Sequence, residues 1–287
     1  MRFGFLLKRG KPEARQIAGE LGRILVGRGC GLAALPDDAE ALPSATVVTP
    51  ERMGASVDAL IVLGGDGTFL YGASLVAEFG VPIFGVNLGS LGFITAFARG
   101  DAAAALEEAC AGRLPIQERL RLAVSMRGPD RGEGQTRCAV NDAVLTQRTE
   151  RSIARLLDLE AHLDGSAIAN YKADGLIIAT PTGSTAYTLA AGGPILTPDV
   201  QAMVLTPICP HTLTHRPLVV RPDARLRIRN VSDDPVTLTI DGQWGHEIGP
   251  GDWIDVRRAD RPLRLYQPPT PFFAILRQKL RWGERQG

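Results

Sequence analysis

The chain has 287 residues, which is long for one core, so two domains are expected. Its composition, 45% hydrophobic and 22% charged residues, is typical of a globular protein. A formal net charge of +1 gives no electrostatic reason to bind nucleic acid or an anionic membrane, so any anionic ligand must be held locally. Four cysteines without a C-x-x-C pair, no signal-peptide pattern and no apolar run of ~18 residues indicate a cytoplasmic protein with reduced thiols and no membrane partner.

The first third of the chain alternates between strand and helix patterns. A strand is expected at 2–7, and Pro12 opens a helix whose apolar residues recur at helical spacing: Ala14, Ile17, Ala18, Leu21, Ile24 and Leu25. Further short apolar strands are predicted at 45–49, 59–65 and 81–87, with helices at about 68–78 and 101–111. Such alternation predicts a parallel sheet covered by helices.

The pattern changes from about Leu120 onward. Short runs rich in β-branched residues are separated by Gly, Pro and Asp turns, and they fall at 120–126, 136–147, 154–165, 174–181, 202–208, 217–230, 235–243 and 252–259. The polar stretch 128–137 reads as a hairpin tip, and 182–193 is the one helical interruption. These features predict an antiparallel sheet or sandwich.

The last segment, 268–283, returns to helical spacing. We expect this helix to pack back on the first domain, with a free amphipathic tail as the alternative. The predicted fold is therefore an α/β domain with a parallel sheet at 1–118, completed by 266–287, joined to a β-rich, sandwich-like domain at 119–265.

The strand at 59–65 runs into a glycine-rich turn, Gly64, Gly65, Asp66, Gly67 and Thr68. Glycines permit positive φ angles and close approach of a ligand to the main chain, and a helix N-terminus attracts phosphate. The turn fits neither G-x-x-x-x-G-K-[ST] nor G-x-G-x-x-G. Its carboxylate either takes a proton from an attacking hydroxyl or holds the magnesium of a nucleotide, which points to phosphoryl transfer. The alternative is that Asp66 only caps the following helix.

Two more segments carry candidate site residues. The glycine-rich turn 87–93 follows the next strand, at the edge where open α/β sheets bind ligands, and either direct ligand contact or simple packing is consistent with it. In 173–195, the strand 176–179 ends in a run of hydroxyl residues followed by Tyr187. These groups suit the edges of a base and a ribose, whereas the alternative is a packed strand-helix unit with a Ser/Thr cap.

The order of these motifs resembles the bacterial NAD kinases over nearly the whole chain: GGDGT, NLGSLGF, VNDAVL, DGLIIATPTGSTAYTLAAGGPI, TPICPHTLTHRPLVV and DGQ. GGDG alone also resembles diacylglycerol kinases, sphingosine kinases and phosphofructokinases. The long TPTGSTAY segment followed by TPICPH is specific. The resemblance implies transfer of the ATP γ-phosphoryl group to the 2'-hydroxyl of the adenosine ribose of NAD, with Mg²⁺ accompanying ATP, and a homodimer or homotetramer.

The resemblance also implies residue roles. Asp66 is the expected general base, with Gly67 beside the substrate, and Asn141 with Asp142 is expected to hydrogen-bond the ribose of an NAD lying in a crevice between the domains. Asp174 would meet the nicotinamide half. The remaining NAD-binding residues that it implies are Arg155, Lys172, Thr182, Thr185, Ala186, Tyr187, Thr188, Leu189, Ala190 and Gln243.

Some residues depart from this pattern or suggest other functions. The family usually has Glu where this chain has Asp142, which puts the ribose contact of Asp142 in question. It often has Ser where this chain has Ala190, so a hydroxyl contact at that position is missing here. Cys209, His211 and His215 have ligand-like spacing, but the prolines around them argue against a zinc site. One rival function is a GGDG-type kinase that acts on a lipid or sugar. Another is a non-enzymatic NAD(P) sensor, but a sensor would gain nothing from an acid beside phosphate.

Overall fold

A computed structural model of the chain describes residues 1–89, 92–95, 97–128, 134–147 and 156–281. It consists of two compact units, Met1–Glu118 with Arg261–Gly287, and Arg119–Asp260. Strand β20 (Leu263–Tyr266) pairs with a strand of the first unit, so the segment 261–265, which the sequence analysis assigns to the second domain, lies in the first.

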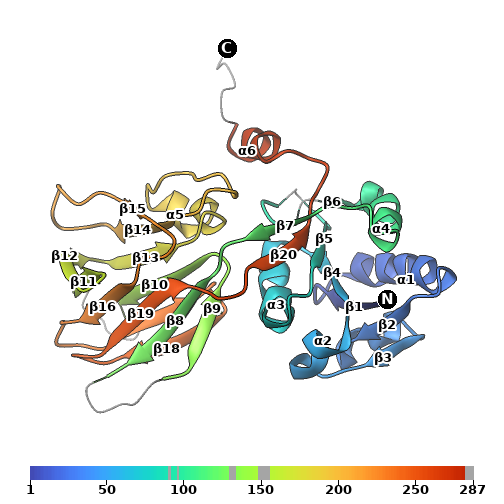
Figure 1. Ribbon diagram of the computed structural model, residues 1–287, viewed down its shortest axis with the longest axis horizontal. Coiled ribbons are helices and arrows are strands. Elements are labelled where there is room, and N and C mark those ends of the chain that lie inside the picture. Colours follow the sequence, from blue (N-terminus) through green and yellow to red (C-terminus); the bar gives the residue numbers. More distant parts are fainter. Residues whose placement is uncertain (90–91, 96, 129–133, 148–155, 282–287) are drawn as a thin grey trace. The chain divides into compact units, whose positions relative to one another are not determined.

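The first unit is built on one sheet in which most strands pair in parallel (Figure 1). Pairing is parallel from strand β3 through β2, β1 and β4 to β5, and both β6 and β20 pair with β5 in the same direction. The strands, in the order of the sheet, are β3 (Ala45–Val47), β2 (Gly31–Ala34), β1 (Arg2–Leu7), β4 (Ala59–Gly64), β5 (Ile83–Asn87), β20 and β7 (Ile116–Arg119), with β6 (Phe97–Ala98) beside β5. The sheet predicted from alternating strands and helices is therefore confirmed.

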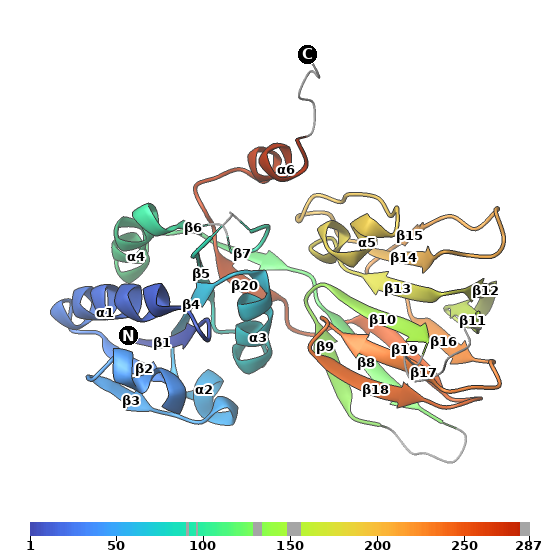
Figure 2. The ribbon, with the colours of Figure 1, turned by 180° about the vertical axis from the view of Figure 1, so that it is seen from behind.

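Helices cover both faces of this sheet (Figures 1 and 2). On one face, Phe3, Phe5 and neighbouring apolar residues pack with helices α1 (Pro12–Gly27) and α4 (Ala102–Cys110). On the other face, Gly4 leaves room for helix α2 (Pro50–Ser56), because a Cβ there would come 2.9 Å from the sulfur of Met53. Helix α3 (Asp66–Val76) follows β4 directly. Short 3₁₀ turns complete the unit at η1 (Pro36–Ala41), η2 (Ala77–Phe79) and η3 (Arg99–Asp101).

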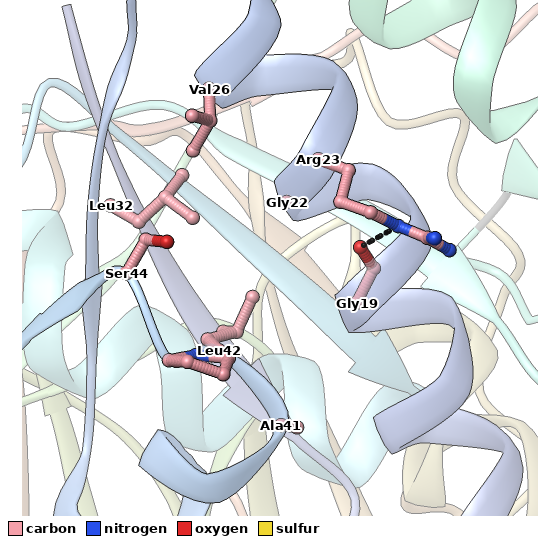
Figure 3. A pocket seen from close by; sticks show the side chains of 9 residues that line it. Gly19, Gly22, Arg23, Val26, Leu32, Ala41, Leu42 and Ser44 are labelled. Atoms are coloured by element: carbon pink, nitrogen blue, oxygen red, sulfur yellow. Dashed lines mark hydrogen bonds between the residues drawn. The ribbon is translucent and has the colours of Figure 1, made fainter.

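A hollow of about 390 Å³ lies between α1 and the segment that leads into β3 (Figure 3). Its wall includes Gly19 and Gly22 of α1, and the guanidinium of Arg23 is turned back to the carbonyl of Gly19, with an Nε to O distance of 3.2 Å. The other lining residues are Val26, Leu32, Ala41, Leu42, Pro43 and Ser44.

The second unit is a sandwich of two six-stranded antiparallel sheets with one apolar core between them (Figures 1 and 2). The first sheet contains β15 (Leu218–Val220), β14 (Met203–Ile208), β13 (Gly175–Ala179), β10 (Asp142–Gln147), β17 (Val236–Ile240) and β18 (Trp244–Ile248). The second contains β12 (Ser166–Ala173), β11 (Leu157–Leu163), β16 (Leu226–Asn230), β19 (Trp253–Arg258), β8 (Leu122–Arg127) and β9 (Thr136–Ala139). The short turns η4 (Gly183–Thr185) and α5 (Tyr187–Ala190) follow β13.

The C-terminal helix α6 (Phe272–Leu280) belongs to the first unit. The ring of its Phe272 lies 6.3 Å from that of Phe93, measured between centroids, and the Nζ of Lys279 lies 6.0 Å from the same ring. Ile275 and Leu276 are buried. The helix thus contacts the loop after β5. In the part of the chain that the structure describes, no helix has the length and apolarity needed to cross a bilayer.

Candidate functional site

The glycine-rich turn of the first unit connects β4 to α3, and the helix begins at Asp66, two residues earlier than predicted. None of Gly64, Gly65 and Gly67 has a positive φ, so this turn does not use the left-handed backbone that glycine permits. The space around the three positions differs. A Cβ at Gly64 would come 2.6 Å from the hydroxyl of Thr68, and a Cβ at Gly65 or Gly67 would meet nothing within 4 Å. The last two positions are therefore open to a ligand.

The carboxylate of Asp66 is held by the loop after β5 rather than by its own helix. Oδ2 accepts the N–H of Phe93 at 3.0 Å. Oδ1 accepts the N–H groups of Ile94 at 3.4 Å and Thr95 at 3.1 Å, and also the hydroxyl of Thr95 at 2.8 Å. The N-cap of α3, Gly65, makes no side-chain cap bond. Helix capping alone therefore does not account for this acid.

The same loop contains a chain of hydrogen bonds behind the acid. The side-chain amide of Asn87 donates to the hydroxyl of Thr95 at 3.0 Å, and its oxygen accepts the N–H of Gly89 at 2.6 Å. A Cβ at Gly92 would overlap with Oδ1 of Asp66. The described part of the 87–93 turn therefore packs directly on the acid.

In the second unit, the turn 140–142 precedes strand β10 and is held by one carboxylate. Asp241 Oδ1 accepts the N–H groups of Asn141 at 2.7 Å and Asp142 at 3.1 Å, while Oδ2 accepts that of Val140 at 2.8 Å. Asp241 lies in the tight turn between β17 and β18, where its φ is 51° and that of Gly242 is 63°. Asp and Gly tolerate such angles, so the three-residue hairpin loop of Asp241, Gly242 and Gln243 aims this carboxylate.

The other side of the turn 140–142 is held by the segment after β13. The buried hydroxyl of Thr180 donates to the carbonyl of Val140 at 2.6 Å, and its N–H donates to the carbonyl of Asn141 at 2.9 Å. A Cβ at Gly183 would overlap with the carbonyl oxygen of Asn141. The turn that carries the Asn-Asp pair is thus fixed from two sides, and the second side requires glycine at position 183.

Two carboxyl groups share this low-dielectric region. Burial, followed by the nearby negative charge of Asp241, raises the pKa of Asp142 to about 7. Burial also raises the pKa of Asp241, although its three backbone N–H donors and Arg121 act in the opposite direction. Asp142 is only 5% exposed. It can therefore carry a proton near neutral pH and donate a hydrogen bond, which an ionised carboxylate cannot do.

The segment after β13 gathers the polar groups that the sequence analysis singled out. Thr182, Ser184 and Thr188 are buried, whereas the ring of Tyr187 is 45% exposed. Three buried acceptors lack a partner among the described residues: Asn141 Oδ1, Thr188 Oγ1 and Thr206 Oγ1. Unpaired buried polar atoms are costly, so they indicate a place where a ligand or water completes the hydrogen bonds. The proposed neighbours Thr185, Ala186, Leu189 and Ala190 lie on the same short turns, η4 and α5.

Other expected contact residues lie elsewhere in the second unit. Lys172, on β12, has its Nζ 3.5 Å from a carboxylate oxygen of Asp158. Asp174 is exposed and lies between β12 and β13, and Gln243 belongs to the same hairpin turn as Asp241, with its N–H on the carbonyl of Ile240 at 2.9 Å. The structure brings Asn141, Asp142 and Gln243 near one another through that turn, but it does not group Lys172 with them. Arg155 lies outside the described residues.

No group of three or more His, Cys, Asp or Glu side chains is arranged to hold a metal within the described ranges. Cys209 is exposed and has a φ of 45°, and the ring of His215 lies 5.0 Å from that of Tyr171. The backbone N–H of His211 donates to the carbonyl of Lys172 at 2.8 Å. This segment therefore ends strand β14 in a turn.

Sequence reasoning did not single out Thr95 and Asp241, and it placed Asn87 and Thr180 in candidate segments without assigning them the role of holding the candidate groups in place. Asp241 had a local signal, because Asp-Gly between two strands predicts a hairpin turn. The target of its carboxylate is about 100 residues away in the chain. No local pattern identifies such a partner.

Comparison with known proteins agrees with this arrangement. Family models match at residues 3–114, as the ATP-NAD kinase N-terminal domain, and at 140–267, as the ATP-NAD kinase C-terminal domain. The chain is 44% identical over 278 residues to an NAD kinase of Geotalea daltonii, covering 96% of each chain. It is 42% identical over 293 residues to that of Syntrophotalea carbinolica, covering 99% of each.

Solved structures give the same result. The structure superposes on a yeast NADH kinase in complex with NADH with a TM-score of 0.91 at 28% identity, covering 99% of this chain and 88% of that one. An NAD kinase from Archaeoglobus fulgidus in complex with ATP has a TM-score of 0.77 at 22% identity and covers 98% of this chain and 99% of that one, and it supports the fold alone.

A parallel sheet whose glycine-rich turn presents an acid at a helix N-terminus, joined to a sandwich with a hydroxyl-lined turn, defines a nucleotide-dependent phosphotransferase. The matched domains cover most of the chain, and the relatives match it nearly end to end. The chain belongs to the ATP-NAD kinase family.

Proposed function

We propose that the protein transfers the γ-phosphoryl group of ATP to the 2'-hydroxyl of the adenosine ribose of NAD, giving NADP and ADP, with Asp66 as the general base. The observation that carries this proposal is the state of the Asp66 carboxylate: among the described residues Oδ1 has three donors, one of them long at 3.4 Å, whereas Oδ2 has one. A carboxylate oxygen has two lone-pair sites, so Oδ2 keeps one for an incoming hydroxyl.

The step balances at that oxygen. The proton of the 2'-hydroxyl moves to Oδ2 while its oxygen forms a bond to the γ-phosphorus. The bond between that phosphorus and the bridging oxygen breaks, and ADP leaves with the electron pair. Because an alcohol is a poor nucleophile, a positioned base contributes roughly 10²- to 10⁴-fold to the rate. The positive end of α3 favours the phosphate beside it.

Recognition of NAD is assigned to the second unit. The unpaired acceptors Asn141 Oδ1 and Thr188 Oγ1 suit hydroxyl and amino donors of the adenosine, and the exposed ring of Tyr187 suits stacking on a base. Asp142, whose pKa is raised to about 7, is able to donate to a ribose oxygen. The proposed contacts also include Gly67, Lys172, Asp174, Thr182, Thr185, Ala186, Leu189, Ala190, Gln243 and, outside the described residues, Arg155.

Magnesium is treated as part of the substrate MgATP. No described cluster of carboxylates could hold the ion by itself, and Mg²⁺ in nucleotide sites commonly keeps water and phosphate ligands with few from protein. Bound with the phosphates of ATP, it would neutralise charge that develops on the leaving group. The glycine turn, open above Gly65 and Gly67, leaves room for those phosphates.

The direct test is to incubate purified protein with NAD, ATP and Mg²⁺ and to detect NADP with a strictly NADP-dependent dehydrogenase. Asp66→Asn is expected to keep the fold and NAD affinity and to lose about 10²- to 10⁴-fold in kcat. Asp101→Asn removes an exposed acid from the same unit and is the matched control. Full activity of Asp66→Asn would remove this residue from the mechanism.

The rival functions predict different results in the same assay. A lipid or sugar kinase consumes ATP without forming NADP, and a sensor binds NAD without turnover. The family assignment favours neither.

We further propose that the protein is a cytoplasmic homodimer or homotetramer. Its four cysteines are free, as in a reducing compartment, and Leu213, Leu218 and Val219 expose apolar surface that a partner subunit could cover. Light scattering on a sizing column tests the oligomeric state.

A further inference from the structure

We infer that Asn87 and Thr95 are positioning residues that aim the Asp66 carboxylate, through a hydrogen-bond chain running in one direction from Asn87 to Thr95 to Asp66. This inference rests on the proposed role of Asp66 as base. All three residues lie within the first unit, and both Asn87 and Thr95 are buried, so water does not substitute for the chain.

The direction of the chain follows from the donor inventory. The oxygen of the Asn87 side chain accepts the N–H of Gly89, which orients the NH₂ group toward Thr95. The Thr95 hydroxyl accepts that bond and has one hydrogen left. Its neighbour on the other side is Oδ1 of Asp66, at 2.8 Å, an acceptor only. The hydroxyl hydrogen therefore points at the acid.

In this arrangement the two oxygens of Asp66 have different roles. Oδ1 is the anchor, since it accepts the hydroxyl and two backbone N–H groups, whereas from the part of the loop that the structure describes Oδ2 accepts only the N–H of Phe93. A carboxylate rotates about its bond to Cβ, so without the anchor its plane would turn and its free lone pair would no longer point at an incoming hydroxyl. The chain from Asn87 holds the plane of the carboxylate in one orientation. A misplacement of this kind affects the chemical step more than substrate affinity.

The backbone is shaped to permit the contact. A Cβ at Gly92 would overlap with both Oδ1 of Asp66 and the hydroxyl of Thr95, so the loop can lie against the acid only with glycine there. The N–H of Gly92 donates to the carbonyl of Thr95 at 3.3 Å, which closes the turn that carries the three donors. Position 95 is thereby held with its side chain toward the acid.

The test compares kcat and KM for NAD in variants of this chain. Thr95→Val keeps the shape and removes the hydroxyl, and we expect kcat to fall about 10- to 100-fold, as for the loss of one hydrogen bond to a charged group. KM for NAD should stay within about threefold, because the residue does not contact substrate. Thr95→Ser restores the donor and should recover kcat to within about threefold.

Asn87→Asp tests the direction of the chain. A carboxylate at position 87 can still accept the N–H of Gly89 but cannot donate, so it would draw the Thr95 hydrogen away from Asp66. The fall in kcat should match or exceed that of Thr95→Val. Activity equal to the unmodified protein would overturn the inferred direction. Because this variant changes no volume, it also serves if Thr95→Val fails to fold, which thermal melting would reveal.

Asp66→Asn, alone and combined with Thr95→Val, separates this inference from the proposed function. If Thr95 acts through Asp66, the valine substitution should change the kcat of Asp66→Asn by less than about twofold. An equal further loss would show a structural role and overturn the inference. If Asp66→Asn loses activity but Thr95→Val does not, the inference fails and the function stands. If Asp66→Asn is fully active, the base assignment fails first.

Discussion

Asp142→Asn should remove a pH dependence of stability that the native protein carries. Burial and Asp241 raise the pKa of Asp142 from its ordinary value of 3.8 to about 7. Between these two values the folded chain binds more protons than the unfolded chain, so the free energy of unfolding falls as the pH rises from about 4 to 7. At about 1.4 kcal/mol per pKa unit, the full effect is about 4 kcal/mol.

Urea denaturation of the ligand-free protein at pH 5 and pH 8 measures this effect. Asparagine has the shape of the protonated acid and no charge, so the stability of Asp142→Asn should not depend on this titration. The free energy of unfolding of Asp142→Asn, relative to that of the unmodified protein, should therefore be about 2.5 kcal/mol higher at pH 8 than at pH 5. Asp233→Asn, which removes an exposed carboxylate from the same unit, is the control and should show a much smaller difference. Equal pH dependence in Asp142→Asn and the unmodified protein would refute the buried, proton-sharing environment.

Three further substitutions test the packing around the sites. Gly183→Ala should push the turn 140–142 out of place, destabilise the protein by about 1–3 kcal/mol and weaken NAD binding in calorimetry, whereas Gly245→Ala, whose Cβ has its nearest neighbour at 3.9 Å, should do neither. Asp241→Asn should cost about 1–3 kcal/mol in urea denaturation, because an amide cannot accept all three N–H groups; unchanged stability would argue that those bonds are dispensable. Leu276→Ala should cost about 2–5 kcal/mol, since this side chain is fully buried, and a loss below 1 kcal/mol would show that α6 is not packed.

The sequence by itself determined the order and type of most elements. Period-two and period-3.6 patterns found the parallel sheet, the β-rich unit and the C-terminal helix, because each pattern reports which side of an element faces a core. The short strand β2, helix α2 and strand β18 were not predicted, because an element of four to seven residues is too short to show a clear periodic pattern. The glycine-rich turn singled out Asp66 as a candidate, because glycine and acid residues cluster there after a strand, whereas the Asn141–Asp142 pair was proposed only from the resemblance to NAD kinases.

Only the tertiary structure decided how those groups are held. The three N–H groups and the hydroxyl that bind Asp66 come from residues 27 to 29 positions away, and the carboxylate that holds Asn141 comes from 100 positions away. Hydrogen-bond partners at such separations depend on strand order and turn geometry. The local sequence around each residue does not specify these partners. The pKa of Asp142 likewise depends on burial, which arises only when the two sheets of the sandwich pack together.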